Sequence, residues 1–194
     1  MLTVSWSLRV LALAGLLAAA TGPGPLAAEL EGRVVGVRDG DTLDLLTTAN
    51  VQVRVRLAGI DAPEMGQAYG NVAKRALSSM AYGRIARVEW SKKDDYGRVV
   101  GKVRVRDADV ALRMIRQGLA WHYRAYAAEQ SAADRRRYAA AEDGARAQRS
   151  GLWQDPDPVP PWLFRHRHPV RATRHPRGRR RILPHVKAGG AGRV

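Results

Sequence analysis

The sequence predicts an α+β protein, mainly a closed five-stranded β-barrel with about three helices. Hydrophobic and polar residues alternate in several short segments, most clearly in residues 51–57, which is typical of half-buried strands. Longer segments repeat apolar residues at helical spacing, and one of these interrupts the run of strands. Hydrophobic residues make up 45% of the 194 residues and there is no cysteine, so packing alone must hold the core.

Five segments have the pattern of strands. In residues 51–57, every second residue is Val or Leu, and the residues between them are Gln or Arg, so one face is apolar. Asp39-Gly40 joins the first two segments and is a strong hairpin signal. The expected strands are residues 33–38, 42–46, 51–57, 84–90 and 99–105.

Three segments have the pattern of helices. Residues 67–80 carry an apolar stripe that includes Ala73 and Leu77, and residues 109–117 end at Gly118. A third helix is expected after Ser131, where residues 131–134 resemble a capping box, and it should stop near residues 150–151. Five strands with a helix between the third and fourth are typical of an OB-type barrel, a fold that often binds oligonucleotides.

The charge is strongly positive and unevenly distributed. The chain has 33 Lys and Arg against 18 Asp and Glu, a net charge of +15, which favours a polyanionic partner but says nothing about catalysis. Residues 155–194 contain ten basic residues and two acidic ones, a net charge of +8, and few apolar residues. This segment is therefore expected to be a largely disordered basic tail.

Residues 1–28 resemble a secretory signal peptide. Arg9 is their one charge, an apolar run follows it, and small residues lead to Ala28. Cleavage after Ala28 would make Glu29 the first mature residue, so the body of the protein is residues 29–154 and the protein is exported to the periplasm or the medium. The apolar run is shorter than a membrane-spanning helix, although an uncleaved membrane anchor is the alternative.

Acidic and arginine side chains recur where the predicted strands end. A barrel can bring such ends together, which would form an acidic cluster with two arginines beside it. Phosphodiester hydrolysis needs an activated water, a cation and donors for the phosphoryl oxygens, and carboxylates suit Ca²⁺ or Mg²⁺ while arginine suits phosphate. Taken singly, these residues more often belong to a turn, a helix cap or an exposed strand face, and only their combination indicates a site. The set is Asp39, Asp41, Arg56, Asp61, Glu64 and Arg98.

Three ordered motifs carry a resemblance to a known family. Residues 38–42 (Arg-Asp-Gly-Asp-Thr), 55–64 (Val-Arg-Leu-Ala-Gly-Ile-Asp-Ala-Pro-Glu) and 95–98 (Asp-Tyr-Gly-Arg) resemble the signature segments of staphylococcal nuclease. The likeness extends over roughly residues 33–154. It implies an OB-type barrel that hydrolyses DNA and RNA with Ca²⁺. The carboxylates by themselves would also suit Mg²⁺ or another divalent cation.

The resemblance also implies a metal-ligand set. Asp41 and Asp61 correspond to the carboxylate ligands, and the backbone carbonyl of Ala62 to a further ligand, where the family often has Thr. Asp39 would lie beside the metal.

The same resemblance implies roles for the remaining residues. Glu64 would be the general base, or would orient the attacking water, and Arg56 and Arg98 would stabilise the phosphoryl transition state. Tyr96 and Tyr126 fall where the family binds the nucleotide. Arg124 takes the place of a third pocket tyrosine, the loop after Glu64 is short, and Asp95 replaces a lysine.

Three functions are compatible with these features. The first is an exported, monomeric nuclease that prefers single-stranded or frayed DNA or RNA and has no stable membrane association after signal cleavage. The second is a non-catalytic OB-type module that binds nucleic acid, which would have no need for the carboxylates beside the arginines. The third is a basic protein that binds the cell envelope through its tail, which explains the tail but not the body.

Overall fold

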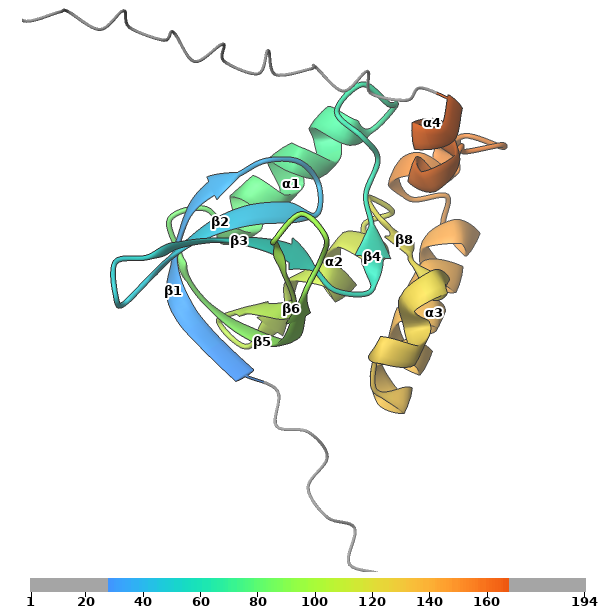
Figure 1. Ribbon diagram of the computed structural model, residues 1–194. Coiled ribbons are helices and arrows are strands. Elements are labelled where there is room, and N and C mark those ends of the chain that lie inside the picture. Colours follow the sequence, from blue (N-terminus) through green and yellow to red (C-terminus); the bar gives the residue numbers. More distant parts are fainter. Residues whose placement is uncertain (1–27, 168–194) are drawn as a thin grey trace, which may run out of the picture.

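The structure, a computed structural model, describes residues 28–167 (Figure 1). In chain order its elements are β1 (Ala28–Val37), β2 (Thr42–Thr47), β3 (Gln52–Leu57), β4 (Ile60–Asp61), α1 (Gly70–Ala81), β5 (Ile85–Lys93), β6 (Val99–Val105), β7 (Ala108–Asp109), α2 (Val110–Arg116), β8 (Trp121–His122), the 3₁₀ helix η1 (Arg124–Glu129), α3 (Ala132–Ala147), the 3₁₀ helix η2 (Gly151–Gln154) and α4 (Pro161–Arg167).

Five strands close into a barrel, which confirms the predicted fold class. Their order is β3-β2-β1-β5-β6, neighbours in this order are antiparallel, and a parallel pairing of β3 with β6 closes the ring. β1 is longer than the expected strand 33–38 because residues 28–33 pair with β5 while the later residues pair with β2. The sequence pattern does not predict this first half, because its polar residues, such as Glu29 and Glu31, alternate with few large apolar ones.

The barrel interior is filled by the predicted apolar face. In β3, Val55 and Leu57 are fully buried, whereas Val51, which precedes the strand, is 55% exposed. In β6, the alternate residues Val99, Val103 and Val105 are buried as expected. Burying a side chain of this size stabilises the fold by about 1.5–3 kcal/mol, so this interior is the main source of stability.

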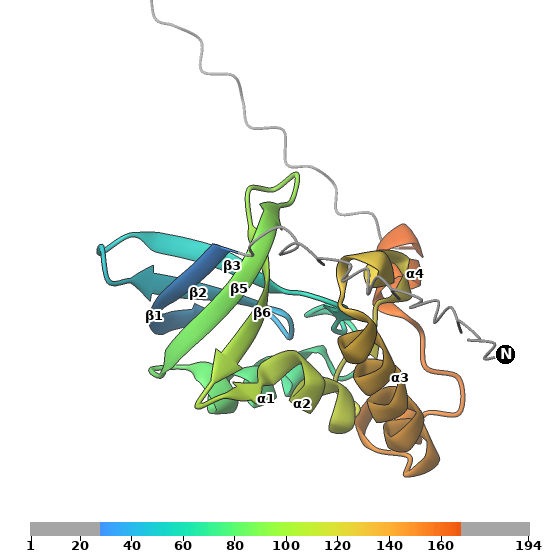
Figure 2. The same ribbon diagram turned by 90° about the horizontal axis from the view of Figure 1, so that it is seen from below.

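Helices α1 and α2 lie together at one end of the barrel, and α3 lies to its side (Figure 2). α1 begins at Gly70 rather than at residue 67, because the Gln67 N–H donates to the Glu64 carbonyl and the Gly70 N–H to the Gln67 carbonyl, which makes two turns first. The predicted cap of α3 is confirmed, since the Asp134 N–H donates to Ser131 Oγ at 3.0 Å.

The chain stays ordered past Gln154, so the expectation of a disordered tail from residue 155 is wrong for residues 155–167. A second apolar cluster, with Trp121 and Trp153 at its centre, includes Trp162 from α4. The Trp162 ring centroid lies 5.5 Å from that of Trp121 and 5.4 Å from that of Tyr123. The high positive charge of residues 155–194 predicted disorder, although the segment also contains these apolar residues.

The two ends of the chain lie outside the described residues. The signal peptide predicted for residues 1–28 therefore falls almost entirely outside the structure, as does the remainder of the basic tail, residues 168–194. Within residues 28–167, none of the helices has the length and apolarity needed to cross a membrane.

Gly118 is predicted to be essential for stability. It follows α2 with a φ of +64°, and a Cβ there would lie 2.0 Å from the Ser150 carbonyl oxygen. We expect Gly118→Ala to lower the free energy of unfolding by about 2 kcal/mol or more, because it adds both backbone strain and a clash. Urea denaturation measures this change.

Gly144, inside α3, is the matched control. A Cβ at this position meets open space, so Gly144→Ala should raise the free energy of unfolding by about 0.5–1 kcal/mol. Equal effects of the two substitutions would contradict the assigned role of Gly118.

Candidate active site

The β1–β2 turn places Asp39 and Asp41 against β4. Gly40 is needed here for close approach rather than for a left-handed backbone, since a Cβ would lie 2.6 Å from the Ala62 Cβ. The Asp41 N–H donates to Asp39 Oδ1 at 3.0 Å, and the Ala62 N–H donates to Asp41 Oδ2 at 3.3 Å. Because glycine has no side chain, the turn that carries Asp39 and Asp41 can lie against the segment that carries Asp61.

Arg56 joins the two carboxylates that were expected to bind metal. It lies on β3 with its side chain 14% exposed, and its Nη2 lies 3.4 Å from Asp41 Oδ2 and 3.3 Å from Asp61 Oδ1. Asp61 itself is 1% exposed on β4, which pairs with β8. One positively charged nitrogen therefore lies within reach of both buried carboxylates.

Burial and mutual repulsion shift the protonation of this cluster. Burial, with the negative charge of Asp41 adding to it, raises the pKa of Asp39 to about 6. Burial also raises the pKa of Asp61, although the hydrogen bonds from Arg165 act in the opposite direction. Burial lowers the pKa of Arg56, but the charges of Asp41 and Asp61 outweigh it and the net shift is upward. A cation in this pocket would relieve the repulsion between the carboxylates.

A tight loop after β4 holds Glu64 at the rim of the same pocket. The Glu64 N–H donates to Gln67 Oε1 at 3.1 Å, and the Gln67 N–H returns to the Glu64 carbonyl at 2.8 Å. Gly70 lets the chain pass close behind, because a Cβ there would lie 1.9 Å from the Glu64 carbonyl oxygen. The backbone is thereby fixed while the carboxylate, 37% exposed, can reach solvent.

Arg98 is fixed by the loop before β6. Asp94 accepts from the Arg98 N–H at 2.9 Å and from its Nε at 2.7 Å. Arg98 Nη1 lies 3.5 Å from Thr42 Oγ1, which in turn donates to Asp41 Oδ1 at 2.9 Å. This network directs the guanidinium toward the acidic cluster.

The structure brings all nine predicted site residues to one pocket of about 430 Å³. Tyr96 is 85% exposed at its edge, with the Arg98 guanidinium carbon 5.3 Å from its ring centroid. Tyr126 is 50% exposed, and Lys92 Nζ lies 4.9 Å from its ring centroid. The nine residues are Asp39, Asp41, Arg56, Asp61, Ala62, Glu64, Tyr96, Arg98 and Tyr126.

The pocket is also lined by residues that the sequence did not indicate. Arg165 of α4 contacts both Asp61 and Glu64, and Tyr123 forms part of the wall beside Tyr126. The signal that could have identified Arg165 is the pair of aromatic residues near it, Trp162 and Phe164, which are typical of a packed rather than a disordered segment. The other such residues include Lys92, Asp94 and Glu129.

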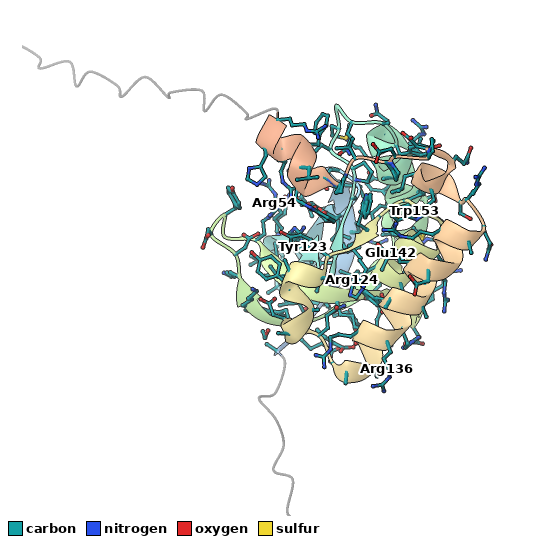
Figure 3. All side chains as sticks on the ribbon, turned by 90° about the vertical axis from the view of Figure 1, so that its right-hand side faces the viewer. Arg54, Tyr123, Arg124, Arg136, Glu142 and Trp153 are labelled. Carbon is teal, nitrogen blue, oxygen red and sulfur yellow. The ribbon has the colours of Figure 1, made fainter. Side chains whose placement is uncertain are left out.

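Arg124, which replaces a family tyrosine, contacts α3 instead of lining this pocket. Its Nη2 donates to Glu142 Oε2 at 3.1 Å, and Figure 3 shows the two side chains close to each other. Glu142 also accepts from the His122 N–H at 3.0 Å, so its 3% exposed carboxylate is satisfied from both sides. Arg124 therefore joins η1 to α3 through an ion pair.

The donor set fits a hard divalent cation. Among residues 28–167, no three His, Cys, Asp or Glu side chains converge on one metal position. Asp41 and Asp61 nevertheless supply two buried carboxylates that already share a cationic partner, and Ala62 lines the same pocket. Calcium accepts backbone carbonyls and water for its remaining positions, so two carboxylates suffice chemically.

An OB-type barrel that carries carboxylates and arginines together in a solvent-accessible pocket defines a class of protein suited to phosphodiesters. Carboxylates alone would repel such a ligand, and arginines alone would only bind it. The combination places charge of both signs where a phosphate and a cation can lie side by side.

Comparison with known proteins gives the same assignment. The model of the family described as staphylococcal nuclease homologue matches residues 54–155. A protein of Escherichia coli described as an uncharacterized endonuclease is 40% identical over 143 residues, 73% of this chain and 89% of its own length. The micrococcal nuclease of Shigella flexneri is 37% identical over 150 residues, 73% of this chain and 83% of its own length. The chain belongs to the staphylococcal nuclease family.

Proposed function

We propose that this protein is an exported, metal-dependent endonuclease that hydrolyses phosphodiester bonds of DNA or RNA. The observation that carries the proposal is the convergence of Asp41, Asp61 and Glu64 with Arg56 and Arg98 in one pocket. A module that only binds nucleic acid gains nothing from buried carboxylates, which repel phosphates. The endonuclease and nuclease descriptions of the relatives support the same activity.

A divalent cation is part of the proposal. Asp41, Asp61 and the backbone carbonyl of Ala62 would hold Ca²⁺, with Mg²⁺ or another divalent cation as alternatives. When bound, the ion supplies positive charge that stabilises the charge developing on a phosphoryl oxygen. The two carboxylates are buried together, so their negative charges repel each other. This repulsion favours binding of a doubly charged cation between them.

Protein side chains carry the remaining steps. Glu64 accepts a proton from water as the water oxygen bonds to phosphorus, the bond from phosphorus to the leaving oxygen breaks, and that oxygen takes up a proton. Arg56 and Arg98 donate hydrogen bonds to the phosphoryl oxygens as their charge grows. Tyr96 and Tyr126 offer exposed rings at the pocket wall for bases.

The size of the pocket supports a substrate preference. A pocket with a volume of about 430 Å³ admits a single nucleotide unit more readily than a rigid duplex. This size favours single-stranded or frayed nucleic acid. All of the proposed catalytic residues come from one chain, so a monomer suffices for activity. The predicted signal peptide supports location in the periplasm or the medium.

The proposed activity is tested by digesting heat-denatured DNA with the purified mature chain in Ca²⁺, in Mg²⁺ and in chelator. We expect cleavage to internal fragments with at least one metal ion and none with chelator. Binding to DNA without cleavage under every condition would instead favour the non-catalytic binding module.

The basic tail is predicted to contribute to substrate binding. Residues 168–194 contain eight Lys and Arg and no acidic residue. We expect truncation after Arg167 to weaken DNA binding and to flatten its dependence on salt, because fewer counterions are released. Binding titrations at several salt concentrations measure the slope. An unchanged slope in a truncated chain that unfolds at the same temperature would show that the tail does not touch the substrate.

A further inference from the structure

Arg165 occupies the carboxylate oxygens that a metal ion would need. Its Nη1 donates to Asp61 Oδ1 at 3.1 Å and to Glu64 Oε1 at 2.7 Å, and its Nη2 donates to Asp61 Oδ2 at 2.8 Å. Both oxygens of Asp61 are therefore engaged by one guanidinium, in the paired geometry that arginine favours with carboxylates. Asp61 Oδ1 also lies 3.3 Å from Arg56 Nη2.

The helix that carries Arg165 is anchored independently of this ion pair. Trp162 packs against Trp121 and Tyr123, and Gln67 Nε2 donates to the Val159 carbonyl at 2.5 Å. Figure 1 shows α4 beside the loop that follows β4. Because the packing residues differ from the contacting residue, the Arg165 side chain, 44% exposed, can leave the carboxylates without release of α4.

Binding of a divalent cation must change these contacts. A cation held by Asp61 would lie against the oxygen atoms that Arg165 now contacts, and two positive charges cannot share them without repulsion. The ion and the arginine therefore compete for the Asp61 oxygens. Any hydrogen bond from Arg165 to Asp61 that the ion replaces is lost as part of the binding equilibrium, and this loss lowers the observed affinity for the ion.

We propose that Arg165 is an internal cation that a divalent metal ion must displace from Asp61, so that the C-terminal helix sets the metal affinity of the site. This inference rests on the metal dependence proposed above. It assigns a purpose to residues 161–167, whose helix brings Arg165 to the pocket. The Arg165 guanidinium also offsets the negative charges of Asp61 and Glu64.

Calcium titration calorimetry without nucleic acid tests this proposal with the natural chain, Arg165→Gln and Arg167→Gln. Arg167 has the same charge on the same helix but lies outside the pocket. We expect Arg165→Gln to bind Ca²⁺ about tenfold more tightly, the scale of a lost charged hydrogen bond, and Arg167→Gln to bind as the natural chain does. The rise in melting temperature on adding Ca²⁺ should also be larger for Arg165→Gln.

Other outcomes overturn the proposal. Unchanged or weaker Ca²⁺ binding by Arg165→Gln contradicts displacement, and equal tightening in Arg167→Gln shows a general charge effect. If Arg165→Gln does not fold without metal, Arg165→Lys, which keeps the charge but loses the fork, should still tighten binding. If none of the proteins binds Ca²⁺ while chelator still stops DNA cleavage, this inference fails and the proposed nuclease function with another metal stands.

Discussion

Replacing Glu64 with Gln is expected to reduce turnover by about 10²–10⁴-fold, the range for loss of a general base. Glutamine has the same shape but cannot accept the proton from the attacking water. The fold should be retained, because the contacts that hold the loop at Glu64 come from its backbone and from Gln67. Single-turnover cleavage of an oligonucleotide, together with thermal unfolding, measures both effects.

Glu129→Gln is the matched control for Glu64→Gln. Glu129 lines the same pocket but pairs with Lys92, so its loss removes a negative charge without removing the proposed base. We expect its turnover to stay close to that of the natural chain. Near-normal turnover in Glu64→Gln, or an equal loss in both variants, would show that Glu64 does not act as the base.

The second large effect is expected from Arg56→Lys, with a loss of about 10²–10³-fold in turnover, as for removal of one donor to a transition-state oxygen. Lysine keeps the positive charge but not the planar fork, so it cannot contact a phosphoryl oxygen and the buried carboxylates in the same geometry. The side chain is 14% exposed and its Nη2 lies near both Asp41 and Asp61. Turnover at saturating metal and substrate measures the effect.

Arg54 provides the control on the same strand. Its Nε lies 3.2 Å from Asp44 Oδ1, in an ion pair outside the pocket. Arg54→Lys should therefore leave turnover unchanged. If Arg54→Lys and Arg56→Lys lose the same activity, the effect comes from barrel stability rather than from contact with the phosphate.

Local patterns predicted the barrel because they record which face of each strand is buried. The alternation in residues 51–57 correctly placed Val55 and Leu57 inside. The cap at Ser131 was equally visible, since a capping hydrogen bond joins residues that are close in sequence. The β4–β8 pairing was missed, because Ile60–Asp61 and Trp121–His122 are too short to show any period.

The candidate site was predicted as a set of residues but not as a geometry. Asp41, Asp61 and Arg56 were expected to converge, and they do, but the sequence does not reveal that one Arg56 nitrogen lies near both carboxylates. It also does not reveal that Gly40 serves close packing against Ala62 rather than a left-handed turn. These features depend on how the turn, β3 and β4 meet in space.

The residue pattern alone predicts the barrel, the acidic and arginine motifs and the unequal distribution of the +15 charge. Its periodicities and local motifs involve residues a few positions apart, where the physics of strands, turns and caps operates. Only the folded arrangement shows that residues 161–167 form α4 and that Arg165 lies on Asp61 and Glu64. That contact joins residues about a hundred positions apart, and it forms because Trp162 finds an apolar surface on Trp121 that exists only in the folded protein.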